Sequence, residues 1–136
     1  MNTLYIEVTG KCIWEHVTQP HTVFEPCWSI DIKVDDDNKE LIKESKLKTH
    51  HRPDEAVRFR RRVRDFNGKK KELPFLLDDK GRSWNKGLIG NGSLVTVIGG
   101  LYEWTYRNHK GVSADLYSVQ VLDHIPYPKE KVDDSI

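Results

Sequence analysis

The sequence has 136 residues, of which 32% are charged and 37% hydrophobic, and its formal net charge is +1. This length suits one domain with one core, so we expect a single domain over residues 1–126 and a short flexible tail over residues 127–136. A net charge near zero does not by itself indicate a nucleic-acid partner. The two cysteines, Cys12 and Cys27, are too few for a disulfide scaffold and lack the spacing of a zinc knuckle.

The N-terminal residues do not have the basic and apolar segments of a signal peptide. No stretch of the sequence approaches the roughly 20 apolar residues that a membrane-spanning helix needs. We therefore expect a soluble intracellular protein.

Two strands are predicted at the start of the chain. In residues 4–17 the apolar side chains alternate with polar ones, and Gly10 interrupts the pattern, which predicts a bulge. Residues 23–34 alternate more regularly, as expected of a half-buried strand, and Trp28 is predicted to lie in the core.

One short helix follows. The acidic run at residues 35–38 ends the second strand and favours a helix N-terminus, and residues 39–48 are mostly helix formers with Leu41, Ile42 and Leu47 on one side. His50 and His51 are predicted to be loop residues rather than metal ligands, because no acidic or cysteine partner has ligand spacing.

The most one-sided segment is AVRFRRRVRDF, residues 56–66. In a strand, one face would carry Arg58, Arg60, Arg62 and Arg64 at a spacing of about 6–7 Å. Phosphates of a single-stranded nucleic acid repeat at a comparable distance, so the row suits a groove that follows such a backbone. The alternative is a strand face that simply carries solvated charges.

The second half of the chain predicts further strands. Asn67-Gly68 is a strong hairpin signal and is followed by a predicted return strand over residues 69–78, which Pro74 restricts to a sheet edge or a bulge. Residues 82–92 are predicted to form a loop. A long strand over residues 93–107 contains Gly99-Gly100, which predicts a sharp bend, as at a barrel corner.

A turn over residues 108–111 and a last strand over residues 112–123 complete the pattern. The fold class is therefore mainly all-β: a small barrel of five to six strands with one short helix between the second and third strands.

Aromatic residues supply a second functional signal. Tyr102, Trp104 and Tyr106 share one face of the long strand, and nucleic-acid bases stack on such rings for about 1–3 kcal/mol each. The pattern leaves open whether these rings are exposed or belong to the core. Trp14 is expected near the groove, and Trp84 is expected at its lip because Arg82 and Lys86 flank it.

Signals for catalysis are weak. The sequence has no P-loop, HExxH motif or Ser/His/Asp spacing, and no cofactor or metal site is predicted. Carboxylates at Asp31, residues 35–37 and residues 78–79 could hold Mg²⁺ in a nuclease, but the last two groups read better as turns. The alternatives to a single-strand binder are an RNA-binding module, a metal-dependent nuclease, and a barrel whose arginines meet an acidic protein.

Three segments in order carry a family resemblance: LLDDKG at residues 76–81, LIGNGS at residues 88–93, and a strand that runs into LYEW at residues 101–104. With the helix between the second and third strands, the chain resembles the single-stranded-DNA-binding proteins of short-tailed (podovirus-type) bacteriophages, which have an OB-type barrel. Tyr102 and Trp104 match the Tyr-x-Trp pair of that family, and residues 56–66 occupy its basic strand.

The resemblance implies a protein that coats single strands during phage DNA replication and recombination in the host cytoplasm, without chemistry. It also implies a monomer or homodimer whose acidic C-terminal tail docks replication proteins. The last five residues of this chain, 132–136, have only two acids, Asp133 and Asp134, and end in Ile136.

We therefore predict binding of single-stranded DNA with little sequence preference. The predicted contact residues are Arg58, Arg60, Arg62, Arg64, Lys69, Lys70, Lys71, Arg82 and Lys86 for phosphates, and Trp14, Trp84, Tyr102 and Trp104 for bases.

Overall fold

The computed structural model describes residues 4–20, 26–51 and 54–126. The expected tail over residues 127–136 and the expected start of the second strand at residues 23–25 lie outside this part of the chain. The elements are β1 (Leu4–Ile13), β2 (Cys27–Lys33), α1 (Lys39–Ser45), β3 (Thr49–His51), β4 (Glu55–Arg62), β5 (Phe75–Leu77), β6 (Leu94–Tyr106) and β7 (His109–Asp123).

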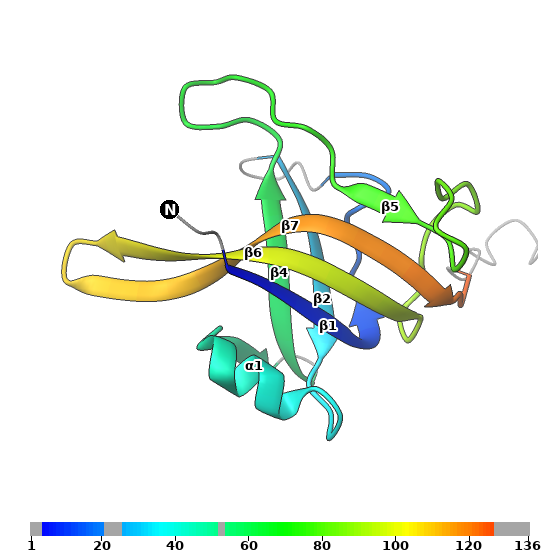
Figure 1. Cartoon of the computed structure of the whole chain (residues 1–136). Coiled ribbons are helices and arrows are strands. Elements are labelled where there is room, and N and C mark those ends of the chain that lie inside the picture. Colours follow the sequence, from blue (N-terminus) through cyan, green and yellow to red (C-terminus); the bar gives the residue numbers. More distant parts are fainter. Residues whose placement is uncertain (1–3, 21–25, 52–53, 127–136) are drawn as a thin grey trace, which may run out of the picture.

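Five of these strands close into a barrel (Figure 1). The sheet order is β3-β4-β2-β1-β6-β7-β5, and an additional parallel pairing of β4 with β7 at Arg60 and Asp115 closes the ring. This arrangement confirms the predicted OB-type barrel, with α1 between the second and third strands of the ring. Within the described residues, no helix is long and apolar enough to cross a membrane.

The barrel interior holds alternating side chains from all five ring strands. Trp28 lies in this core, as predicted, and Phe59 of β4 is completely buried at its centre. Gly99 faces the Phe59 ring so closely that a Cβ atom there would lie 2.7 Å from it. At Gly99-Gly100, where a sharp bend was predicted, the β6–β7 register shifts between Ile98 and Gly99.

That shift explains a change of side-chain parity in β7. Ile98 pairs with Ser118 and Gly99 with Leu116, so Tyr117 is the extra residue of the irregularity. Val119 points into the core with odd parity, whereas Leu116 does so with even parity. Tyr117 therefore does not share the core-facing side of Val119, and its ring instead lies over Gly100.

No bulge occurs at Gly10, contrary to the prediction, because this residue keeps the regular β1–β6 register opposite Val95. Its small size serves packing instead. A Cβ atom at Gly10 would lie 2.8 Å from both Nδ2 of Asn38 and a methyl group of Ile32. Nδ2 of the buried Asn38 donates to the backbone carbonyls of Thr9 and Lys33, at 3.2 and 3.0 Å, and so ties the start of α1 to β1 and β2.

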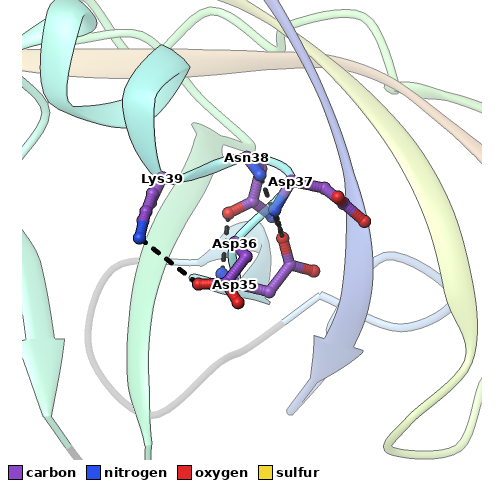
Figure 2. Close-up of polar contacts among 5 residues, drawn as sticks. All are labelled: Asp35, Asp36, Asp37, Asn38 and Lys39. Atoms are coloured by element: carbon purple, nitrogen blue, oxygen red, sulfur yellow. Dashed lines mark hydrogen bonds and ion pairs between the residues drawn. The ribbon is translucent and has the colours of Figure 1, made fainter.

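The acidic run before α1 forms a turn, as predicted (Figure 2). Oδ1 of Asp35 accepts hydrogen bonds from the backbone N–H groups of Asp37 and Asn38, at 2.9 and 3.0 Å. Lys39 pairs with Asp36 at 3.3 Å. The helix then ends at Ser45, before the predicted end at residue 48, because Lys46 adopts a left-handed conformation with φ of 64°.

The predicted return strand over residues 69–78 is largely wrong. Residues 63–71, which we call the finger, form a short hairpin turn around Asn67-Gly68, as predicted, with one antiparallel bridge between Arg64 and Lys70 and a backbone hydrogen bond from the Lys71 N–H to the Val63 carbonyl at 2.8 Å. Only Phe75–Leu77 is a strand, and it pairs in parallel with β7 rather than with β4. β4 itself ends at Arg62: the Val63 N–H still donates to the carbonyl of Pro26, but Pro26 has no N–H with which to continue the ladder.

Two short elements also differ from the predictions. Residues 49–51, predicted as loop, form the edge strand β3 beside β4. The turn between the last two strands consists of Arg107 and Asn108 rather than residues 108–111, so that β7 begins at His109. Beyond the barrel, β6 and β7 continue as a paired two-stranded ribbon, residues 101–114, which we call the arm (Figure 1).

Candidate nucleic-acid interface

The outward face of β4 carries the predicted arginine row. Arg58, Arg60 and Arg62 are exposed, whereas Val57 and Phe59, which have the opposite parity on the strand, are fully buried. β2 and β4 are the second and third strands of the ring, and this is the face on which OB folds bind oligonucleotides. Alternation on a half-buried strand thus places three cations on the surface where a nucleic acid would lie.

Arg58 is held in place by a buried carboxylate. Its Nε and Nη2 donate to Oδ1 and Oδ2 of Asp31 on β2, at 2.8 and 3.1 Å, and the Asp31 side chain is only 2% exposed. These hydrogen bonds raise the pKa of Arg58 above its ordinary value. Nε2 of His50 on β3 lies 3.0 Å from Oδ2 of Asp31, without hydrogen-bond geometry. The two hydrogen bonds to Asp31 therefore fix the Arg58 side chain and leave its Nη1 as the nitrogen that does not bond to Asp31.

The other row members differ in their contacts. Arg60 makes no ion pair or hydrogen bond through its side chain to any residue in the described part of the chain. Arg64 lies past the end of β4, and its Nη1 donates to the carbonyl of Gly68 at 3.1 Å inside the finger. Lys69 and Lys70 of the finger are exposed.

Arg61 turns into the seam between β4 and β7. Its Nη1 donates to Oδ2 of Asp115 at 2.7 Å, its Nε donates to the carbonyl of Glu72 at 2.8 Å, and its guanidinium lies 5.7 Å from the centre of the Tyr117 ring. Lys71 lies 3.7 Å from the same Asp115 carboxylate. The positive charge of Lys71, a predicted phosphate contact, is therefore partly neutralised by this carboxylate of the barrel.

The arm presents the three aromatic rings to solvent. Tyr102, Trp104 and Tyr106 are 47%, 40% and 65% exposed, which answers the question that the sequence left open. Trp104 has a fixed seat, because its Nε1 donates to Oγ of Ser113 at 3.0 Å and its ring lies against Gly111 on the opposite strand.

Strand register puts the rings and the arginine row on one surface. Arg60 pairs with Asp115 across the β4–β7 seam, and both side chains point outward. Two residues earlier in β7, Ser113 has the same outward parity and pairs with Tyr102. The outer face of β4 is therefore continuous with the aromatic face at the base of the arm.

Two lysines of the α1–β3 connection, which the sequence reading missed, lie beside this surface. Lys46 and Lys48 line an open pocket of about 510 Å³ together with Trp104 and residues 109–113 of β7.

Alternation with the core residues Ile30 and Ile32 places Asp31 on the outer face of β2. Its carboxylate lies against Arg58 and His50, which come later in the chain, so no local signal predicted its burial.

Trp84, the predicted lip of the groove, makes several contacts within the protein. The ring packs against the core, its Nε1 donates to the carbonyl of Gly87 at 2.7 Å, and His124 meets it edge-on at 4.7 Å. Lys86 lies over the ring at 5.9 Å from its centre. Trp84 is therefore half-buried, with contacts to the core, to His124 and to Lys86.

Arg82 belongs to the same turn. Its Nε lies 3.9 Å from Oδ2 of Asp78, and the backbone hydrogen bond from Arg82, the largest cause, lowers the pKa of Asp78. Residues 78–86 lie at the end of the barrel opposite the arm (Figure 1). Arg82 and Lys86 therefore form no continuous surface with the aromatic arm.

Trp14 is half exposed and follows the end of β1, with a φ of 50° and its N–H bonded to Oδ1 of Asn91 at 2.8 Å. That end of β1 also lies away from the arm (Figure 1). The structure thus brings together the arginine row, the arm and the finger, and leaves Trp14, Arg82, Trp84 and Lys86 apart. Within residues 4–20, 26–51 and 54–126, no three His, Cys, Asp or Glu side chains gather as a metal site.

The sequence matches no protein-family model and no curated protein. Solved structures do share its fold. The single-stranded DNA-binding protein gp2.5 of bacteriophage T7 superimposes with a TM-score of 0.73 at 13% identity, over 98% of this chain and 94% of that one. The single-stranded DNA-binding protein of bacteriophage Enc34, in complex with single-stranded DNA, superimposes with a TM-score of 0.66 at 16% identity, over 92% and 89% of the two chains. These likenesses establish that the OB-type fold extends over nearly the whole chain.

Proposed function

We propose that this protein binds single-stranded DNA with little sequence preference. The observation that carries the proposal is the continuity of two surfaces: the exposed guanidiniums on the outer face of β4 and the exposed rings at the base of the arm. Cations that follow a backbone and rings that accept any base are the two parts of a sequence-tolerant single-strand site.

In this proposal Arg60 and Arg62 contact phosphates directly, and Arg58, held by Asp31, presents its remaining edge to the strand. Tyr102 and Trp104 stack on bases. The hydrogen bond from Trp104 to Ser113 holds the indole in place before DNA binds, so that less side-chain entropy is lost on binding.

The solved relatives support this reading. The T7 and Enc34 proteins are named as single-stranded DNA-binding proteins, and one of the Enc34 structures contains single-stranded DNA. Each likeness covers more than nine tenths of this chain. Shared architecture, together with the cations and rings on the expected face, favours the same ligand class here.

We further propose that the protein holds the strand without chemistry and protects it during phage DNA replication and recombination in the host cytoplasm. Docking of replication proteins through residues 127–136 remains part of the proposal, as does a monomeric or homodimeric state. Chemical cross-linking of the full chain with and without DNA distinguishes the two assembly states.

Titration of tryptophan fluorescence with oligo-dT tests the central proposal. Trp104 is exposed on the arm and Trp28 is buried, so we expect partial quenching that weakens as salt increases. Trp104→Phe is the matched variant, and it should lose most of the quenching while it retains binding in a label-based assay.

Competition between DNA and RNA oligomers of equal length tests the RNA-binding alternative. Incubation of the DNA with the protein and Mg²⁺ tests the nuclease alternative. We expect DNA to compete at least as well as RNA and to remain intact. Absence of binding at low salt would overturn the proposal, whereas preferential RNA binding or strand cleavage would redirect it to the RNA-binding module or the nuclease.

A further inference from the structure

The finger holds an exposed aromatic ring that neither the predicted site nor the arm includes. Phe66 lies at its tip and is 91% exposed, more than any other large hydrophobic residue among those described. A phenylalanine this exposed gains nothing from the core, because almost none of its surface is removed from water. The position of the ring therefore requires an account other than folding.

The finger is an ordered turn that positions this ring. Oδ1 of Asp65 accepts hydrogen bonds from the backbone N–H groups of Asn67 and Lys69, each at 2.9 Å. The Asp65 N–H donates to the carbonyl of Lys69 at 2.8 Å, and Gly68 adopts a φ of 82° that favours glycine. Phe66 is thus held between two constrained residues, with its side chain in solvent.

Three cations of the finger, Arg64, Lys69 and Lys70, flank Phe66 in sequence. Arg64 braces the turn through its hydrogen bond to the Gly68 carbonyl, and Lys69 and Lys70 are exposed. An exposed ring with neighbouring cations can hold a base together with its flanking phosphates. The composition of the finger therefore matches a nucleotide better than it matches an apolar protein surface.

The finger also continues the arginine row. It begins where β4 ends, after Arg62, so the outward row leads from the base of the arm along β4 to the finger. The arm joins the surface near Arg58, because β7 runs parallel to β4. Six residues of extended chain, from Arg58 to Arg64, span about 20 Å. This length corresponds to roughly three nucleotides of extended single-stranded DNA.

We propose that Phe66 is a second base-stacking residue, at the opposite end of β4 from Tyr102 and Trp104, and that a bound strand runs along β4 between the two aromatic sites. This inference rests on the proposed binding of single-stranded DNA and specifies its path. It assigns phosphate contacts to Lys69 and Lys70 at the end of that path.

Affinity for an oligo-dT of about 20 nucleotides tests the inference. Phe66→Ala should weaken binding by roughly 5- to 100-fold, whereas Phe66→Trp should retain affinity and add fluorescence that DNA quenches. Phe66→Leu keeps apolar bulk without a ring and should behave like the alanine variant. The slope of affinity against salt should not change in Phe66→Ala, because no phosphate contact is lost.

Phe75→Ala is the matched control, because Phe75 is 70% exposed but lies on β5, and it should bind like the wild type. Equal affinity of Phe66→Ala and wild type would overturn this inference and leave the proposed function intact. Failure of the wild type to bind would overturn both. A change in oligomeric state in Phe66→Ala, measured by sedimentation without DNA, would assign the ring to a protein contact and overturn the inference.

Discussion

Arg58 on β4 and Asp31 on β2 form a two-bond ion pair across neighbouring strands, with distances of 2.8 and 3.1 Å. The arginine side chain is half exposed and the aspartate side chain is 2% exposed, so the pair joins the exposed outer face of β4 to a buried carboxylate of β2. The fully buried Ala56 lies beside them on β4, opposite His50 of β3. The outer face of β4 is therefore partly structural and partly available to a ligand.

Removal of the Arg58 side chain is expected to destabilise the protein more than removal of Arg60. Arg58→Ala leaves the buried Asp31 carboxylate with only His50 nearby, so we expect a loss of about 2–3 kcal/mol in the free energy of unfolding. Arg60→Ala, on the same strand and face, should cost less than about 0.5 kcal/mol. Urea denaturation of the two variants makes the comparison, and equal midpoints would show that the ion pair contributes no stability.

The free energy of unfolding is expected to fall at alkaline pH, because the Cys12 thiol ionises more readily in the unfolded chain than in the fold. Burial raises the pKa of this thiol to about 12, whereas an unfolded cysteine has a pKa of about 8.5. A raised pKa favours the protonated thiol in the fold, so stability is complete below about pH 8.5 and falls as pH rises toward 12. The slope contributed by this group is at most about 1.4 kcal/mol per pH unit.

Cys12→Ala removes this contribution. Urea midpoints measured near neutral pH and at about pH 10 should fall less in the variant than in the wild type. Cys27→Ala, at the partly exposed second cysteine, should keep the wild-type decline. A decline of equal size in the wild type and in Cys12→Ala would contradict the prediction.

Periodicity predicted the parts of the fold in which each strand keeps one face in the core. The one-sided row at Arg58, Arg60 and Arg62 and the burial of Trp28 follow directly from alternation on a strand. The place of α1 was predicted from the acidic residues that precede it and from its helix-forming residues. Alternation fails where the register shifts, and Tyr117 shows this, since one extra residue changes which parity faces the core.

Long-range contacts account for most of the remaining differences. Alternation places Arg61 on the face opposite the arginine row, but its partner could not be predicted, because Asp115 lies more than fifty positions later in the chain. Trp84 is flanked by cations in sequence, but His124 and the Gly87 carbonyl decide its place. Phe66 was counted as the last residue of a strand, and the hydrogen bonds of Asp65 instead place it at the tip of a turn.

The salt dependence of DNA affinity is expected to report the arginine row. The Arg60→Ala/Arg62→Ala double variant should bind all sequences more weakly, and the slope of log affinity against log salt should flatten by about 0.7 for each lost phosphate contact. Lys11→Ala removes an exposed cation of β1 and serves as the control, because it lies near the end of β1, away from the arm. An unchanged slope in the double variant would show that the row does not contact DNA.

The contacts that hold the Trp104 ring against Gly111 and Ser113 are expected to control how well a DNA base stacks on it. A Cβ atom at Gly111 would lie 2.6 Å from the indole, so Gly111→Ala should displace the ring from its hydrogen bond with Ser113. We expect weaker quenching by oligo-dT and an affinity loss of about 1 kcal/mol, within the range for one stacked base. Stability should change little, because Trp104 and the arm beyond the barrel are exposed.

Ser113→Ala separates the hydrogen bond of Trp104 from the shape of its seat. It removes the acceptor at 3.0 Å but leaves Gly111 in place, so its effect should be smaller than that of Gly111→Ala. Trp104→Ala, which removes the ring itself, sets the upper limit of the loss. If Gly111→Ala bound and quenched like the wild type while Trp104→Ala lost affinity, the ring would be needed but its seat would not, and stacking would depend on a ring that reorients when DNA binds.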